Sequence, residues 1–345
     1  LRSCSHLKKT LQHRIEVLDL KNKIKKGGFK FFTLATGLIV QIGQPAFAQK
    51  APQSTAAVCS TKNTAVTESK IQRAIRIACD EHALWGKPMI DSKGHLIQIG
   101  PMEGETDRLT NGEMAWIRVL HYWTAGVGVS YLYKSDDLSA VSGDDKNAFI
   151  RTRIIDNPWS GAFISYVMKS AGFTSAEFAL NDGHIRYIKP AFNAKEALSR
   201  NEVTDYAFTT QNPFNTRVSA GDLLCYTREG RDVYGADSFN DWLGSHANDD
   251  RSLKSHCDLV VGVTKNRAYS IGGNVVQSVT MRQLSLTAKG FLSPQHSLPV
   301  TPINGSWLVD ALDQDNEAML ICEPFTGRNC DMNRKDWVVL LKSRS

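Results

Sequence analysis

Ser160 is the residue whose type and position best suit nucleophilic chemistry. A helix is predicted to follow it, because apolar residues recur downstream at helical spacing and form one stripe that faces a core. Free backbone N–H groups and the positive dipole end make the first turn of a helix favourable for developing negative charge. The hydroxyl of Ser160 can therefore act as a nucleophile, and it can equally serve as an ordinary N-cap. The apolar stripe consists of Ile164, Val167, Met168 and Ala171.

The boundaries of this helix are predicted from residues with known preferences for helix ends. Asn157 can act as the N-cap, and Pro158 suits the first helical position. Gly172 suits the other end, where a left-handed backbone is favoured. These boundaries place Ser160 within the first turn.

A long polar insertion, residues 229–253, is the second feature that could serve function. Insertions of this length are often functional or mobile, so it is predicted to be a loop that can act as a lid over the site. Its possible cation ligands match no calcium-loop spacing, and a solvated loop is the preferred interpretation. These ligands would be Asp237, Asp241, His246, Asp249 and Asp250.

Cofactor and metal motifs are missing from the sequence. It contains no Cys-x-x-Cys pair, which argues against zinc-ribbon and thioredoxin folds. It also contains neither a phosphate-cradling glycine loop nor a helix carrying metal ligands. No cofactor and no metal are therefore expected.

The first 48 residues read as a signal segment. A lysine-rich region precedes a ten-residue apolar run, residues 31–40, and the small-x-small sequence at 46–48 predicts cleavage after Ala48. A run of that length is too short to span a bilayer, so an uncleaved anchor is the less favoured alternative. Residues 1–20 resemble no signal sequence and are interpreted as an overextended start. The lysines are Lys21, Lys23, Lys25, Lys26 and Lys30.

The charge of the protein belongs mainly to that segment. Residues 1–48 hold nine of the 41 basic and two of the 35 acidic residues, which leaves 32 basic and 33 acidic ones. A nearly neutral body argues against electrostatic capture of nucleic acid or of anionic lipid. No nucleic-acid partner and no stable membrane span after cleavage are therefore expected, and the oligomeric state is left open.

Helical periodicity dominates the first half of the chain and strands dominate the second, which predicts an α+β fold with an antiparallel sheet. An aromatic cluster at 116–123 is interpreted as core. Helices are predicted at 67–86, 112–124, 158–172 and 184–198, with polar connections at 136–145 and 201–217. Strands are predicted at 95–99, 223–226, 256–263, 268–271, 275–284 and 337–341.

Five sequence blocks resemble a bacterial secreted family known as domain of unknown function 2272. That family is itself similar to the NlpC/p60 and CHAP papain-like cell-wall hydrolases, and the blocks keep their order over roughly residues 70 to 290. They are Pro158–Ser165, His184–Ile188, Gly221–Tyr226, His256–Val261 and Ile271–Val275.

The resemblance implies a papain-like (NlpC/p60-type) fold, in which a central helix packs on an antiparallel sheet. Residues 49–66 are then a linker and 67–345 one papain-like domain. Its N-terminal helical part is 67–150, its core 151–290 and its C-terminal extension 291–345.

The resemblance also implies site roles. Ser160 takes the position where those families carry the Cys nucleophile, His256 that of the base, and Asn274 that of the group orienting the base. Trp159, His184 and Asp258 are expected to line the substrate site.

Serine in place of cysteine changes the expected chemistry. A thiol ionises beside an imidazolium at a helix start, whereas a hydroxyl needs a base that removes its proton during attack. Three outcomes follow: a Ser-His-Asn hydrolase, a site that has lost catalysis but still binds, or a nucleophile elsewhere. Cys257 is the obvious other nucleophile, but strand alternation points it away from the face of His256.

The expected function is that of an exported, periplasmic or extracellular hydrolase that cleaves amide bonds of peptidoglycan. One alternative is a non-catalytic module that binds peptidoglycan or another envelope component in the same groove. Another is an esterase or acyl-transfer enzyme, since a serine nucleophile suits esters.

Cleavage would leave six cysteines, an even number that suggests disulfides in an exported protein. Six cysteines allow fifteen pairings. Sequence order and the resemblance favour Cys225 with Cys257, because their strands are expected to be neighbours. Cys322 with Cys330 would close a short loop, and Cys59 with Cys79 would tie the N-terminal arm to the first helix.

Overall fold

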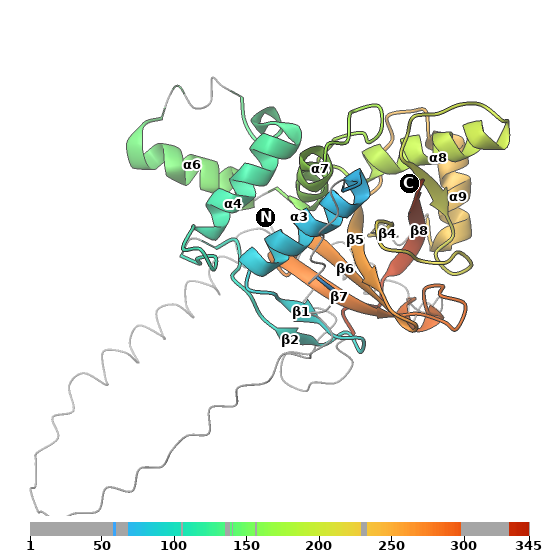
Figure 1. The fold of residues 1–345 in the computed structure, drawn as a ribbon. Helices are drawn as coiled ribbons and strands as arrows, with labels where there is room; N and C mark the ends of the chain where they lie inside the picture. Colours follow the sequence, from blue (N-terminus) through green and yellow to red (C-terminus); the bar gives the residue numbers. More distant parts are fainter. Residues whose placement is uncertain are drawn as a thin grey trace, which may run out of the picture. The chain divides into compact units, whose positions relative to one another are not determined.

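An eight-stranded sheet organises the part of the chain that the computed structural model describes (Figure 1). The described residues are 58–59, 68–104, 106–134, 139, 141–155, 157–228, 233–297 and 331–344. The strand order is β2-β1-β7-β6-β5-β4-β8-β3. The strands are β1 (Met89–Ile90), β2 (Leu96–Gln98), β3 (Phe208–Gln211), β4 (Leu223–Thr227), β5 (Ser255–Val263), β6 (Arg267–Val275), β7 (Ser278–Ser285) and β8 (Asp336–Ser343).

The centre of the sheet is an antiparallel meander formed by β4, β5, β6 and β7. The last strand, β8, lies between β4 and the edge strand β3 and is antiparallel to both. At the other side, β1 pairs with β7 in parallel and with β2 in antiparallel orientation. The α+β class with a mainly antiparallel sheet, expected from the sequence, is therefore confirmed.

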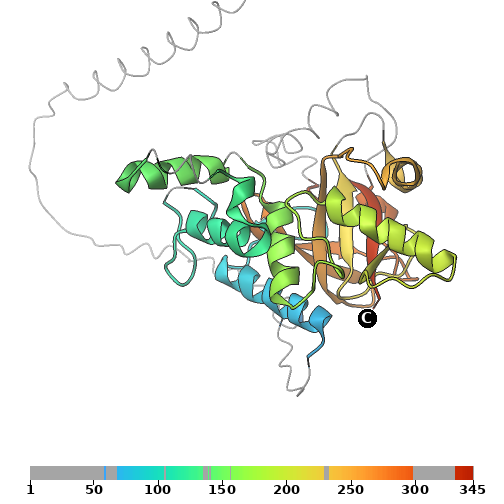
Figure 2. The same ribbon diagram turned by 90° about the horizontal axis from the view of Figure 1, so that it is seen from above.

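The helices pack around this sheet, with α3 and α7 in contact with its central strands and α8 and α9 beside β3 and β8 (Figures 1 and 2). Ser69 and Gln72 form a reciprocal capping box at the start of α3. The helices are α3 (Lys70–Leu84), α4 (Ala115–Tyr122), α6 (Gly143–Ile155), α7 (Ser160–Ser170), α8 (Ile185–Ser199) and α9 (Gly235–His246). Short π- or 3₁₀-helical turns are η1 (Trp123–Val127), η2 (Val129–Tyr131) and η3 (Pro294–His296).

Strand alternation divides the buried side chains between the two faces of the sheet. Leu223 and Cys225 of β4 join the larger core, which also contains Phe163 and Val167 of α7. Leu224 and Tyr226, the residues between and after them, join a second cluster on the other face. Both faces of β4 are thus covered, which explains why all five of its residues are buried.

Several elements differ from the sequence predictions. The N-cap of α7 is Trp159 rather than Asn157, whose side-chain amide donates to the carbonyl of Arg153. The predicted polar connections at 136–145 and 201–217 contribute to α6 and β3. Helix α6 has no clear apolar stripe, with only Ile150 and Ile154 buried, and β3 is a four-residue edge strand, so neither leaves a clear periodic signal. The polar insertion contains α9, which packs beside β8.

Some predictions lie outside the described residues. These are the signal segment, most of the linker, and the proposed Cys322–Cys330 pair. Within the described ranges, no helix is long and apolar enough to cross a membrane.

Two of the expected disulfides are present. Cys225 and Cys257 face each other in register on β4 and β5, with their Cα atoms 4.1 Å apart. Cys59 is bonded to Cys79 of α3. Disulfides persist in oxidising compartments, so both bonds fit a location outside the cytoplasm.

Removing the sheet disulfide with Cys225→Ala and Cys257→Ala is expected to lower the free energy of unfolding by about 3–4 kcal/mol. The bond closes a loop with a sequence separation of 32 and so restricts the unfolded chain. Urea denaturation of oxidised protein measures the loss. Free Cys225 or Cys257 thiols in unreduced, unfolded protein would contradict the pairing.

Candidate functional site

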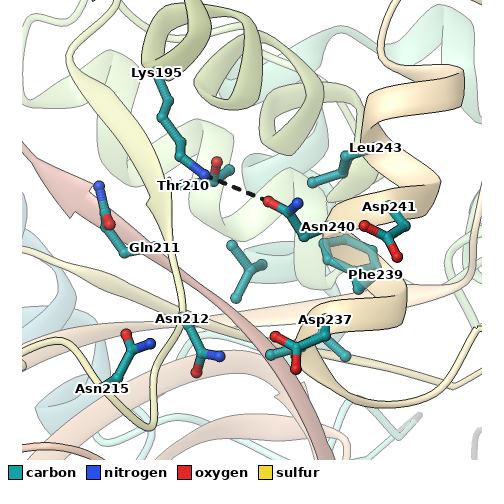
Figure 3. A pocket seen from close by; sticks show the side chains of 13 residues that line it. Lys195, Thr210, Gln211, Asn212, Asn215, Asp237, Phe239, Asn240, Asp241 and Leu243 are labelled. Carbon is teal, nitrogen blue, oxygen red and sulfur yellow. Dashed lines mark hydrogen bonds between the residues drawn. The ribbon is translucent and has the colours of Figure 1, made fainter. Parts of the chain in front are cut away.

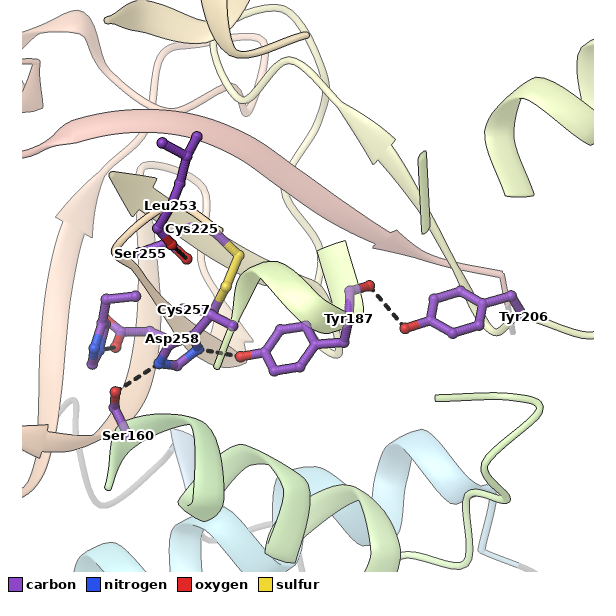
Figure 4. Close-up of a disulfide and its surroundings, with 10 residues drawn as sticks. Ser160, Tyr187, Tyr206, Cys225, Leu253, Ser255, Cys257 and Asp258 are labelled. Carbon is purple, nitrogen blue, oxygen red and sulfur yellow. Dashed lines mark hydrogen bonds and ion pairs between the residues drawn. A yellow bond between two sulfur atoms is a disulfide. The ribbon is translucent and has the colours of Figure 1, made fainter. Parts of the chain in front are cut away.

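The site begins at the first residue of α7. Ser160 is 5% exposed, and its hydroxyl lies 2.6 Å from the Nε2 atom of His184 (Figure 4). The N-terminal position follows from the local sequence, since Trp159 is the N-cap and its carbonyl accepts from the N–H of Phe163. The hydroxyl therefore lies in the first turn, as the sequence predicted.

His184 reaches Ser160 because the loop before α8 lies directly against the start of α7. A Cβ atom on Gly161 would lie 1.9 Å from the carbonyl oxygen of Asp182, so only glycine permits this approach. One turn further along α7, the Ser165 hydroxyl donates to the carbonyl of Asn181 at 2.7 Å and accepts from its N–H at 2.9 Å. The glycine and the serine together fix the loop that carries His184.

Tyr187 holds the other side of the His184 ring. Its hydroxyl is hydrogen-bonded to Nδ1 of His184, and its own carbonyl accepts a hydrogen bond of 2.8 Å from the Tyr206 hydroxyl. The tautomer that suits a general base carries its proton on Nδ1, which donates to Tyr187, and accepts the Ser160 proton at Nε2. The Tyr187 hydroxyl thus has the position, relative to the histidine, that a carboxylate or amide has in catalytic triads.

Burial sets the protonation state of His184. The side chain is 3% exposed, and burial lowers its pKa well below the usual 6.5, with further lowering from the nearby positive charges of His256 and Arg228. The imidazole is therefore neutral near pH 7 and able to accept a proton.

His256, the base predicted from the sequence, lies beside His184, with 5.0 Å between ring centroids. Its Nε2 atom is 2.8 Å from Oδ1 of Asp258, and its Nδ1 atom is 3.5 Å from the guanidinium of Arg228. Asp258 in turn pairs with Arg282 at 3.2 Å. His256, Asp258 and Arg282 are all fully buried.

Strand alternation explains why His184, rather than His256, reaches Ser160. A Cβ on Gly273 would meet Phe163 and Trp159, so Gly273 faces α7. A Cβ on the adjacent Gly272 would lie 1.9 Å from Asp258 and 2.9 Å from Nε2 of His256. His256 therefore projects from the sheet face opposite the one on which α7 packs. Cys257 projects toward α7, the side on which His256 was expected, and it forms the expected disulfide with Cys225.

The remaining predicted site residues take different positions. Asn274, at the end of β6, is half-buried with a φ of 55°, in the left-handed region that asparagine tolerates. Trp159 is fully buried and its ring stacks on Trp85 and Tyr122, with 5.6 Å between centroids in each pair. Trp159 therefore positions the start of α7 from within the core. The catalytic role of Asn274 stays a prediction.

A pocket of about 300 Å³ opens beside the Ser160–His184 pair. Arg228 and Lys254 bring positive charge to its wall, and Asp182 brings a carboxyl group whose pKa is raised by burial. A substrate carbonyl in this pocket would lie near the N-terminal N–H groups of α7. The pocket is lined by Pro158, Ser160, Asp182, Gly183, His184, Arg228 and residues 252–255.

The described residues form an α+β protein in which a buried serine hydroxyl contacts a buried histidine at the start of a helix. The model of the family DUF2272, described as an uncharacterized protein conserved in bacteria, matches residues 110–343. The chain therefore belongs to the DUF2272 family. No match was found among curated proteins or among solved structures. The matched range includes Ser160, His184 and His256.

His184 was predicted only to line the site, and its contact with Ser160 was not anticipated. The sequence signal was present in the block His184–Ile188, which places Tyr187 three residues after His184. That spacing puts both side chains on one face of a helix start. Nothing in the sequence indicated that the preceding loop would lie on Gly161.

Gly161→Ala is expected to destabilise the protein by about 1–3 kcal/mol, because the new methyl group must displace the Asp182 backbone. Gly244→Ala on α9 is the matched control, since its Cβ would meet only Phe192 at 4.0 Å. It should be neutral or stabilising by up to about 1 kcal/mol. Thermal unfolding measures both, and equal effects would refute the proposed role of Gly161.

The pKa of His184 can be measured by NMR of histidine-labelled protein. We expect its ring to remain neutral at pH 6, where an ordinary histidine with a pKa near 6.5 is mostly protonated. Because the unfolded chain then binds a proton that the folded chain does not, stability should fall as the pH drops below about 6.5. Urea-unfolded protein is the control, and a native His184 pKa of 6.5 or higher would contradict the burial argument.

Proposed function

We propose that this protein is an exported hydrolase that cleaves amide bonds in peptidoglycan, with Ser160 as nucleophile and His184 as general base. The 2.6 Å contact between the Ser160 hydroxyl and Nε2 of His184 carries the catalytic part of the proposal. The assignment of this chain to the papain-like fold and the choice of peptidoglycan as substrate rest on the resemblance of the sequence blocks to NlpC/p60 and CHAP hydrolases. The two disulfides support export.

The first step of the reaction follows from this geometry. Oγ of Ser160 forms a bond to the substrate carbonyl carbon while its proton moves to Nε2 of His184. The negative charge that develops on the carbonyl oxygen is stabilised by the N–H groups and dipole at the start of α7. His184 then returns the proton to the departing amine, the C–N bond breaks, and an acyl-serine remains.

The second step releases the acyl group. A water molecule gives its proton to the neutral His184 and attacks the acyl carbon. The imidazolium then protonates Oγ of Ser160 as the ester bond breaks, which restores the starting state. Tyr187 keeps the His184 ring in one orientation through both steps.

The low pKa of His184 also limits the catalytic efficiency expected of this site. A general base is most efficient when its pKa lies near the working pH, and burial holds the pKa of His184 well below 6.5. The positive charges of His256 and Arg228 oppose the imidazolium that forms during attack. In compensation, the neutral base persists in mildly acidic solution, so activity should be retained below pH 6.

Ester hydrolysis is a second candidate, favoured by the identity of the orienting group. Tyr187 carries no negative charge, so it stabilises the His184 imidazolium less than a carboxylate would. An alkoxide leaving group depends less on protonation by that imidazolium than an amine does. Envelope-attached esters are therefore alternative substrates for the same Ser160 and His184.

The test compares Ser160→Ala and His184→Gln with the chain beginning at Gln49. Ser170→Ala is the matched control, because it removes a serine hydroxyl from the exposed end of the same helix. We expect losses of about 10²-fold or more in the first two proteins and none in the control. Release of soluble muropeptides from purified sacculi measures amide cleavage, and turnover of p-nitrophenyl esters measures the second candidate.

His256→Gln decides between the two histidines. Loss of activity with His256→Gln but not with His184→Gln would return the base to the position predicted from the sequence. Full activity of Ser160→Ala would overturn the nucleophile assignment. Binding of all variants to insoluble peptidoglycan, without release of fragments, would instead favour a non-catalytic envelope-binding module.

A further inference from the structure

A second pocket, of about 410 Å³, lies between α8, α9 and the strands β3 and β8 (Figure 3). It shares no lining residue with the pocket at Ser160. Lys195 marks its position on α8, eleven residues after His184, which corresponds to about 16 Å along the helix axis. The second pocket is therefore separate from the proposed catalytic site.

The wall of this pocket contains a buried hydroxyl group without a hydrogen-bond partner. Thr210 of β3 is 3% exposed, and its Oγ1 atom has no partner among the described residues. Buried polar groups are nearly always hydrogen-bonded, so each exception calls for an explanation. A ligand hydroxyl in the pocket would supply the missing partner.

The other polar groups of the pocket offer both donors and acceptors. Asn212 and Asn240 present amides, Asp237 and Asp241 present carboxylates, and Lys195 presents an ammonium group (Figure 3). The amide of Asn212 is already oriented, because its Oδ1 atom accepts a 2.9 Å hydrogen bond from the N–H of Phe214. The site is thus partly preorganised for a polar ligand.

Charge excludes the simplest ionic ligands. The ammonium group of Lys195 opposes a metal cation, and the carboxylates of Asp237 and Asp241 oppose an anion. The floor is apolar, formed by Leu243, Val338 and Val339. A neutral ligand with hydroxyl groups can both donate hydrogen bonds to this pocket and accept them from it. A sugar ring carries such hydroxyl groups and also has an apolar face of C–H groups that suits the floor.

We infer that this pocket binds a neutral sugar unit. Its volume falls in the usual range for small-molecule sites. Hydroxyls of the sugar would form hydrogen bonds with Thr210, the amides and the carboxylates, and its C–H face would lie on the apolar floor. The inference does not depend on the proposed hydrolase activity, since none of these residues contacts Ser160.

The experiment uses the chain beginning at Gln49, with N-acetylglucosamine and glucose as probes at millimolar concentration. Binding is measured by saturation-transfer NMR and by calorimetry. Thr210→Val removes a hydroxyl group, and Asn240→Ala removes an amide that also accepts a 3.4 Å hydrogen bond from Lys195, so we expect binding about three- to tenfold weaker in each. Asn193→Ala is the matched control, because it removes an amide of α8 that lies outside the pocket and bonds to Asn248. It should bind like the unmodified chain.

Thermal unfolding separates lost binding from lost structure. Thr210→Val replaces an unpartnered hydroxyl with a methyl group of the same shape, so its stability should be unchanged or higher. Weaker sugar binding by this stable variant supports the inference. Absence of binding by the unmodified chain, equal binding by Thr210→Val and Asn193→Ala, or binding of calcium in place of the sugars would each overturn it.

Discussion

The close approach of the loop at Asp182 to the first turn of α7 is the contact on which the site depends. The carbonyl of Asp182 occupies the space that any side chain at position 161 would need. This approach places His184 on Ser160 and begins α8 at the next residue, so Tyr187 meets the histidine from the same helix. The sheet contributes by burying Trp159 and Phe163 against Gly273, which fixes the start of α7.

The proposed mechanism combines a hydroxyl nucleophile with a strongly buried base. In papain-like enzymes the thiolate is formed before attack, whereas in the proposed mechanism the proton leaves Ser160 during attack. The neighbouring His256, Asp258 and Arg282 form a buried group in which Asp258 pairs with both of the other residues. Burial lowers the pKa of His184, with further lowering from the positive charges of His256 and Arg228, and this keeps the ring neutral. Protonation of the base is thus avoided at the cost of basicity, which limits the leaving groups the site can expel.

Much of this architecture could be predicted from the sequence. The apolar stripe of α7 and the strands β4 to β7 depend on local periodicity, which the sequence records directly. The Cys225–Cys257 pair was favoured by sequence order together with the family resemblance. Helix α9 was missed because its apolar residues are few, with only Phe239 and Leu243 buried. Strand β3 was missed because a four-residue edge strand needs β8, more than a hundred residues later, to define it.

The serine–histidine contact could not be predicted for a related reason. Ser160 and His184 are separated by a complete helix and a loop, and the path of that loop is determined by the missing side chain of Gly161. The resemblance assigned the base to His256. This residue lies on β5, as expected, but its side chain projects from the sheet face opposite α7. Neighbouring residues of a strand point to opposite faces of a sheet, so a shift of one residue would turn His256 toward α7. The sequence alone does not show which face of β5 packs on α7, and the base was therefore assigned to His256 rather than to His184.

Covalent labelling of Ser160 by a fluorophosphonate tests the central claim most directly, because this reagent reports the nucleophilicity of a serine without requiring the natural substrate. Peptide mapping identifies the labelled residue, and the rate is compared between the unmodified protein and His184→Gln. The structure predicts labelling at Ser160 that slows by about 10²-fold or more in the variant. Labelling elsewhere, or an equal rate in both folded proteins, would contradict activation of Ser160 by His184.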